Sequence, residues 1–139
     1  KFHWEGNRLK MSQSETKTPF ETDIRDCPDL FPILVVLACA ARGKSRIVGV
    51  DRLKNKESDR LSVMCEVLDT FHVPFKLESN AIVISGTETV SGGIINTHQD
   101  HRIAMASTIA ACIASSSIVL SEEHCVTKSY PSFFTDLFE

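Results

Sequence analysis

The sequence predicts an α/β fold, classed as α+β in some schemes, in which a βαβαββ unit is repeated. Short runs typical of strands alternate with longer apolar runs typical of helices, and the order strand, helix, strand, helix, paired strands begins again before the last residue. The chain has 139 residues, of which 42% are hydrophobic. Because this length and composition suffice to bury a core, we expect one globular unit.

Local signals indicate each element of the first unit. Residues 2–11 have the pattern of a hairpin, and residues 20–24 that of a strand. Residues 30–41 are apolar on nearly all sides, with Asp29 available as N-cap and a proline in the first turn, so a buried helix is expected. The unit is completed by a strand at 46–48, a helix at 57–71, and a hairpin formed by 75–77 and 81–85.

The second unit is expected to begin with a strand at 94–95. Residues 103–114 then form a helix of small residues, for which Asp100 is the expected N-cap. A strand at 117–120 follows, and Pro131 opens a short helix that runs to residue 137. The sequence therefore predicts that the same order of elements begins again after the first unit.

Composition excludes several classes of protein. The net charge of -3, without a basic tail, argues against general nucleic-acid binding. The apolar run at 30–41 is too short to span a bilayer, and no signal-peptide pattern opens the chain. The five cysteines are far apart and form no C-x-x-C pair, which is typical of reduced thiols in a cytoplasmic protein and does not favour a zinc site: Cys27, Cys39, Cys65, Cys112 and Cys125. The chain begins without methionine, so we expect it to be a piece of a longer protein.

Two blocks of charged residues are the clearest indication of a binding or catalytic site in the sequence. Lys56-Glu57-Ser58-Asp59-Arg60 and Asp100-His101-Arg102 each stand at the expected start of a helix. Backbone N–H groups at a helix start favour anions, so cations and acids gathered there suit a phosphate or carboxylate ligand. On spacing alone, a solvent-exposed face of ion pairs is the simpler interpretation of the first block.

The remaining candidates differ in how well a local role explains them. Helix capping fully explains Asp29 and Asp100. Arg102 is a cation where the helix dipole disfavours one, which indicates an anionic partner. His101 is expected to be a packed structural histidine, and Lys128, ahead of the last helix, is a weak signal alone.

Taken together, these residues resemble the C-terminal signatures of the 5-enolpyruvylshikimate-3-phosphate synthase family. The ordered motifs are Asp26-Cys27-Pro28-Asp29, Leu53-Lys54-Asn55-Lys56-Glu57-Ser58-Asp59-Arg60, Asp100-His101-Arg102-Ile103-Ala104-Met105-Ala106 and Thr127-Lys128-Ser129-Tyr130-Pro131-Ser132-Phe133. The resemblance implies transfer of the enolpyruvyl group of phosphoenolpyruvate to the 5-hydroxyl of shikimate 3-phosphate, in aromatic amino-acid biosynthesis, without a metal or organic cofactor. It also implies the enolpyruvyl transferase fold of two domains with three βαβαββ units each. Residues 1–139 would be most of the C-terminal domain, and the N-terminal domain would be absent.

The resemblance also implies roles for single residues. Asp29 would contact shikimate and act as the base for the 5-hydroxyl, and Glu57 would protonate the methylene carbon of phosphoenolpyruvate. Lys56 would lie where the two substrates meet. Three cations would bind the phosphate and carboxylate of phosphoenolpyruvate: Arg60, Arg102 and Lys128. Their charged ends should then face one open, shallow surface with Glu57 and Asp29 on its rim.

One position departs from the family pattern. Where some members have an asparagine that touches the substrate phosphate, this chain has Arg52, which makes Arg52 a candidate contact only. Two alternatives stay open: a UDP-N-acetylglucosamine enolpyruvyl transferase, which lacks the block at 56–60, and a non-catalytic anion-binding module. The whole enzyme is expected to be a cytoplasmic monomer without nucleic-acid or membrane partners, and this piece alone is expected to be inactive.

Overall fold

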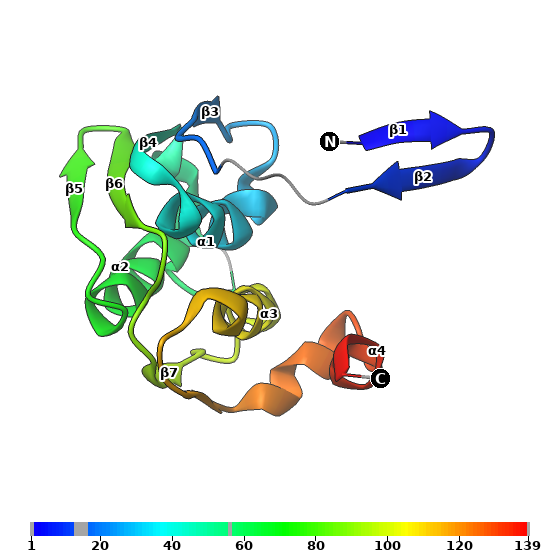
Figure 1. Ribbon diagram of the computed structural model, residues 1–139. Helices are drawn as coiled ribbons and strands as arrows, with labels where there is room; N and C mark the ends of the chain where they lie inside the picture. Colours follow the sequence, from blue (N-terminus) through cyan, green and yellow to red (C-terminus); the bar gives the residue numbers. More distant parts are fainter. Residues whose placement is uncertain (1, 13–16, 56, 139) are drawn as a thin grey trace.

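A complete βαβαββ unit forms the body of the protein, as the computed structural model shows for residues 2–12, 17–55 and 57–138. A hairpin of β1 (Phe2–Glu5) and β2 (Arg8–Met11) precedes it and projects away from the body (Figure 1). The unit comprises β3 (Glu21–Asp23), α1 (Phe31–Ala40), β4 (Arg42–Val48), α2 (Arg60–Thr70), β5 (Phe75–Glu78) and β6 (Ala81–Thr87). The predicted order of elements over this range is confirmed.

The four strands of this unit form one mixed sheet in the order β3-β4-β6-β5. Strands β3 and β4 are parallel, as a helical crossover requires, whereas β6 is antiparallel to both β4 and β5. Helix α1 packs on β4 and β6. At the centre of the sheet, Ile47 of β4 is paired with Ile82 of β6, and both side chains are fully buried.

A second unit follows and repeats the first in shortened form. Strand β7 (Gly93–Asn96) and strand β8 (Ile118–Ser121) are parallel and are joined through α3 (His101–Ala110) and the 3-10 turn η3 (Ala111–Ile113). Helix α4 (Phe133–Phe138) comes last, after the 3-10 helix η4 (Glu123–Lys128). In the first unit, the 3-10 helix η2 (Val50–Asn55) stands at the position of η4.

The helices α1, α2 and α3 pack against one another around the core. Helix α1 is apolar on almost every side, and Phe31 and Val35 are fully buried while Leu37 is 51% exposed. No helix among the described residues is both long and apolar enough to cross a membrane.

The helix boundaries differ from the predictions at several places. Helix α1 has Leu30 as its N-cap, because Pro28 begins a 3-10 turn, η1 (Pro28–Leu30), that contains Asp29. The predicted capping role of Asp29 is therefore wrong. Helix α2 begins at Arg60 rather than at residue 57, since the side chain of Asp59 accepts a hydrogen bond from the backbone N–H of Ser62 and caps the helix there.

The predicted cap of α3 is confirmed, since the Asp100 side chain accepts from the backbone N–H of Arg102. The helix itself starts two residues earlier than predicted and gives way to η3 at Ala111. The sequence signals also missed η4, which brings Lys128 close to the start of α2.

Candidate active site

A buried arginine joins three carboxylates from three separate segments of the chain. Arg60, the first residue of α2, donates from Nε to Asp100 (2.7 Å), from Nη1 to Asp29 (2.6 Å) and from Nη2 to Glu57 (2.5 Å). Asp29 comes from η1, Glu57 from the residues just before α2, and Asp100 from the N-cap of α3. One guanidinium therefore fixes the relative positions of η1 and of the starts of α2 and α3.

Burial of this charge is possible because each nitrogen of the guanidinium has an acidic partner. The side chain of Arg60 is 0% exposed, and an unpaired charge at such a position would be strongly destabilising. Burial by itself lowers the pKa of Arg60, but the hydrogen bonds to Asp100 and Asp29 outweigh it and the pKa is raised. Arg60 therefore stays charged at any pH at which the protein is folded.

Asp100 is the second buried member of this cluster and uses both carboxylate oxygens. One oxygen caps α3 by accepting from the backbone N–H of Arg102 at 2.9 Å. The other accepts from Arg60 and, at 3.1 Å, from the hydroxyl of Ser58. Asp100 thus ties the start of α3 to the segment that precedes α2.

The loop that delivers Asp100 is held in an unusual conformation. His98 and Gln99 have φ values of +49° and +56°, in the left-handed region that side chains disfavour. The fully buried Thr97 anchors the loop, since its hydroxyl donates to the carbonyl of Ser121 at 2.9 Å. This anchoring compensates for the strain and sets the positions of Asp100 and Arg102 at the start of α3.

Two cations and two acids form the accessible edge of the cluster. Arg102 Nη2 lies 3.0 Å from Asp29 Oδ2, and Lys128 Nζ lies 3.9 Å from Glu57 Oε1. All four side chains are reached by solvent, the least exposed being Glu57 at 32%. A hollow of about 170 Å³ opens beside Asp29 and Arg102, between α1 and α3. An anion from solution can therefore approach Arg102 and Lys128 at this edge, whereas it cannot reach the buried Arg60.

Two nitrogens at the start of α3 lack a partner. His101 Nδ1 and Arg102 Nε are buried and make no hydrogen bond to any residue that the structure describes. Burial lowers the pKa of His101, so its ring is neutral at pH 7. The expectation of a packed histidine is confirmed, since the residue is 4% exposed.

The cluster agrees with the prediction that widely spaced cations converge, with one correction. Arg60, Arg102 and Lys128 are linked through Asp29 and Glu57 into one network. The expectation that all three cations face an open surface is wrong for Arg60, because its side chain is 0% exposed and each of its three guanidinium nitrogens donates to an acid. The interpretation of the first block as an exposed face of ion pairs is wrong for the same reason.

One further candidate lies apart from this network. Arg52, in η2, donates to the backbone carbonyl of Arg25 at 3.4 Å, and Lys56 lies outside the described residues. The sequence reasoning did not identify Ser58 or Thr97, because a serine or threonine hydroxyl carries no signal in spacing or charge. Over the described part of the chain, no group of three His, Cys, Asp or Glu side chains is placed to hold a metal ion.

Comparison with known proteins places this geometry in context. Residues 1–137 match the family model of EPSP synthase, described as 3-phosphoshikimate 1-carboxyvinyltransferase. A 3-phosphoshikimate 1-carboxyvinyltransferase of Clostridium perfringens is 35% identical over 138 residues, covering 94% of this chain and 32% of that protein. Another from Clostridium acetobutylicum is 42% identical over 115 residues, covering 83% of this chain and 27% of that protein.

Solved structures are similar as well. An EPSP synthase from Acinetobacter baumannii superposes with a TM-score of 0.71 at 33% identity, covering 76% of this chain and 25% of that chain. The enolpyruvyl transferase NikO from Streptomyces tendae gives a TM-score of 0.76 over 99% of this chain and 31% of that chain, but at 16% identity it shows the fold alone. The predicted enolpyruvyl transferase fold is confirmed. The chain spans about a third or less of the length of each of these proteins.

Proposed function

The chain belongs to the EPSP synthase family, and from this premise we propose that its residues form most of the C-terminal domain of an enzyme that transfers the enolpyruvyl group of phosphoenolpyruvate to shikimate 3-phosphate. The substrates would bind between this domain and a second one, which residues 1–139 do not include. The observation that carries the proposal is the accessible edge of two acids and two cations, held in place by the buried Arg60.

This arrangement suits a reaction between two anions. Arg102 and Lys128 are partly exposed and each has a carboxylate as its present partner. A phosphate or carboxylate of a substrate can replace that partner, because charge-assisted hydrogen bonds to either anion are of similar strength.

The two acids take opposite protonation roles in the proposed reaction. Asp29 accepts the proton of the 5-hydroxyl of shikimate 3-phosphate while the oxygen of that hydroxyl forms a bond to C2 of phosphoenolpyruvate. Glu57 gives a proton to the methylene carbon C3. The tetrahedral intermediate then loses phosphate by cleavage of the C2–O bond, and the leaving phosphate takes the proton held by Asp29. The new methyl group returns a proton to Glu57 as the enol ether forms. Both carboxylates bond the same guanidinium, which supports their action on a single bound substrate pair.

Arg60 acts in this proposal by positioning the two acids. The Arg60 side chain is 0% exposed, so a direct contact with phosphoenolpyruvate would require the residues around it to move first. We propose Lys56 and Arg52 as further substrate contacts, Lys56 from its place in the motif and Arg52 with support only from its position in η2. We also propose that the whole enzyme is a monomer and is cytoplasmic, and the five free cysteines support the cytoplasmic location.

A chimeric enzyme tests the proposal. Residues 1–137 would replace the matching segment of the Clostridium perfringens relative, and phosphate release would be measured with both substrates present. We expect turnover, a fall in kcat of about a hundredfold or more for Glu57→Gln, and a rate close to that of the parent for Asp59→Asn. Asp59 is the matched control because it lies in the same motif and its carboxylate caps α2.

A folded chimera without turnover, or full activity of Glu57→Gln, would contradict the proposal. The 139-residue chain alone should show no turnover, because half of the groups that position the substrates would be missing. Turnover by the chain alone would show that the site is complete without a second domain.

A further inference from the structure

The groups of the candidate active site are divided between the two units. The acids Asp29 and Glu57 belong to the first unit, in η1 and just before α2. The cations Arg102 and Lys128 belong to the second unit, in α3 and η4. Contacts within the second unit therefore decide how far apart the two cations lie.

Thr97 lies where the two segments that carry these cations begin. Asn96 and Ser121, the last residues of the parallel strands β7 and β8, are paired in register. Thr97 follows Asn96, is 0% exposed, and donates from its hydroxyl to the carbonyl of Ser121 at 2.9 Å. The chain continues from Thr97 into α3 and from Ser121 into η4. This one hydroxyl thus ties the loop before α3 to the loop before η4.

Two further contacts extend this tie toward the cations. The carbonyl of Thr97 accepts from the backbone N–H of Asp100 at 3.0 Å, and the Asp100 side chain accepts from the backbone N–H of Arg102. On the other side, the thiol of Cys125 makes a weak hydrogen bond of 3.9 Å to the Thr97 hydroxyl. Cys125 lies in η4, one 3-10 turn before Lys128. Thr97 therefore bonds the N-cap of α3 and a residue of η4.

The shape of the loop makes it dependent on such contacts. His98 and Gln99 have positive φ values, a conformation that persists only where the surroundings hold it. Gln99 also donates to Glu122 at 3.1 Å, but this hydrogen bond lies at the surface, where water competes for both groups. The hydroxyl of Thr97 is buried and is not exposed to that competition.

We propose that Thr97 is a positioning residue for phosphoenolpyruvate, because its buried hydroxyl sets the distance between Arg102 and Lys128, the two accessible cations expected to bind that substrate. This inference rests on the proposed function. The two acids of the first unit are held separately, since both accept from Arg60. Loss of the Thr97 hydroxyl should therefore weaken the binding of phosphoenolpyruvate more than it slows the chemical step.

Thr97→Val in the chimera described above tests this role, because valine keeps the shape of the side chain and removes the donor. We expect KM for phosphoenolpyruvate to rise about tenfold, the factor that corresponds to one hydrogen bond, while kcat and KM for shikimate 3-phosphate stay within about twofold. Thr97→Ser keeps the hydroxyl and should restore KM for phosphoenolpyruvate. A purely structural role would instead lower the amount of folded enzyme, and with it the apparent kcat, without a selective change in KM.

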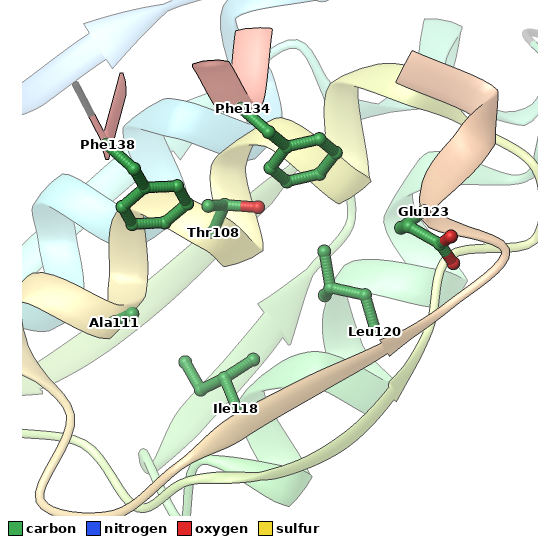
Figure 2. Close-up of a pocket in the computed structure, with 7 residues that line it drawn as sticks. All are labelled: Thr108, Ala111, Ile118, Leu120, Glu123, Phe134 and Phe138. Atoms are coloured by element: carbon green, nitrogen blue, oxygen red, sulfur yellow. The ribbon is translucent and has the colours of Figure 1, made fainter. Parts of the chain in front are cut away.

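Thr108→Val is the matched control. The hydroxyl of Thr108 is also buried, but it donates to the carbonyl of Ala104 within α3 at 2.8 Å. Thr108 lies about 9 Å along the helix from Arg102. Figure 2 shows its side chain beside Phe134, in an apolar pocket of about 340 Å³ that β8 also lines. The same substitution at this position should leave both KM values unchanged.

Hydrogen exchange in the same chimeras tests the tie without substrate. Thr97→Val should speed exchange at the backbone amides of Asp100 and Arg102 about tenfold or more, and leave that of Val63, in α2, unchanged. A parent chimera without turnover would contradict the proposed function and this inference with it. Turnover with the same KM for phosphoenolpyruvate in the parent and in Thr97→Val would overturn the inference alone, and so would unchanged exchange at Asp100.

Discussion

Replacing Asp100 with asparagine tests whether the buried cluster depends on charge. The change keeps the size of the side chain, and its carbonyl oxygen can still accept from the backbone N–H of Arg102, so the cap of α3 is retained. What is lost is the negative charge next to Arg60 Nε, at a place where both side chains are 0% exposed.

The expected loss of stability follows from this burial. Removing one partner of a buried ion pair costs about 3 to 5 kcal/mol, because the other charge stays buried without compensation. Arg60 still has Asp29 and Glu57, so we expect the lower end of that range, about 3 kcal/mol. For a domain of this size, that loss lowers Tm by roughly 10 °C.

Urea unfolding at pH 7 measures the effect, provided that the slope m is unchanged. Asp59→Ala is the control, because it removes a helix cap at an exposed position and should cost about 1 kcal/mol. Asp100→Ala loses both the charge and the cap, and should cost about 4 kcal/mol. If Asp100→Asn costs no more than Asp59→Ala, the cluster does not hold Arg60 by charge, and the reasoning fails.

Three further predictions concern other parts of the chain. Burial lowers the pKa of His101 below its ordinary value of 6.5, so the unfolded state takes up its proton first as the pH falls. The stability that this contributes is complete above pH 6.5 and is lost below it, and His101→Gln should flatten urea-measured stability between pH 7 and 5. A Cβ on Gly86 would lie 2.2 and 2.3 Å from two carbonyl oxygens at the end of α1, so Gly86→Ala should lose about 2 to 3 kcal/mol. Gly6→Ala, with open space around it but φ of +59°, should lose about 1 kcal/mol in the same assay, and equal losses would contradict the steric argument. Burial raises the pKa of the Cys39 thiol to about 12. A thiol reagent at pH 8 should therefore modify the exposed Cys112 on the order of a hundredfold faster than Cys39. Peptide mass spectrometry measures both rates, and similar rates would refute the burial of Cys39.

Local signals in the sequence were sufficient to predict most of the helices and strands of the fold. The strands and helices follow from the spacing of apolar residues and from turn residues between them, and these depend on neighbours within a few positions. The charged residues at 57–60 and 100–102 lie close to the starts of α2 and α3, as predicted, for the same reason. The repeat of the βαβαββ order was also visible, because each unit carries its own local pattern.

The exact helix starts were less predictable, because two local signals competed there. Asp29 could have capped α1, but the turn begun by Pro28 places its carboxylate within reach of Arg60 and Arg102. A charge-assisted hydrogen bond to Arg60 and an ion pair with Arg102 together outweigh one cap. The sequence shows both options and does not show which partner is near.

The sequence by itself thus determined the elements and the position of each charged residue along them, whereas only the tertiary structure decided which charges meet and which of them water can reach. Arg60 bonds acids that lie 31 and 40 residues away in sequence as well as one three residues away. A guanidinium can bond any carboxylate that comes close, so its partners are set by how η1, α2 and α3 pack. Its burial has the same origin, because the surface that a side chain exposes depends on every element packed around it and not on its own neighbours in sequence.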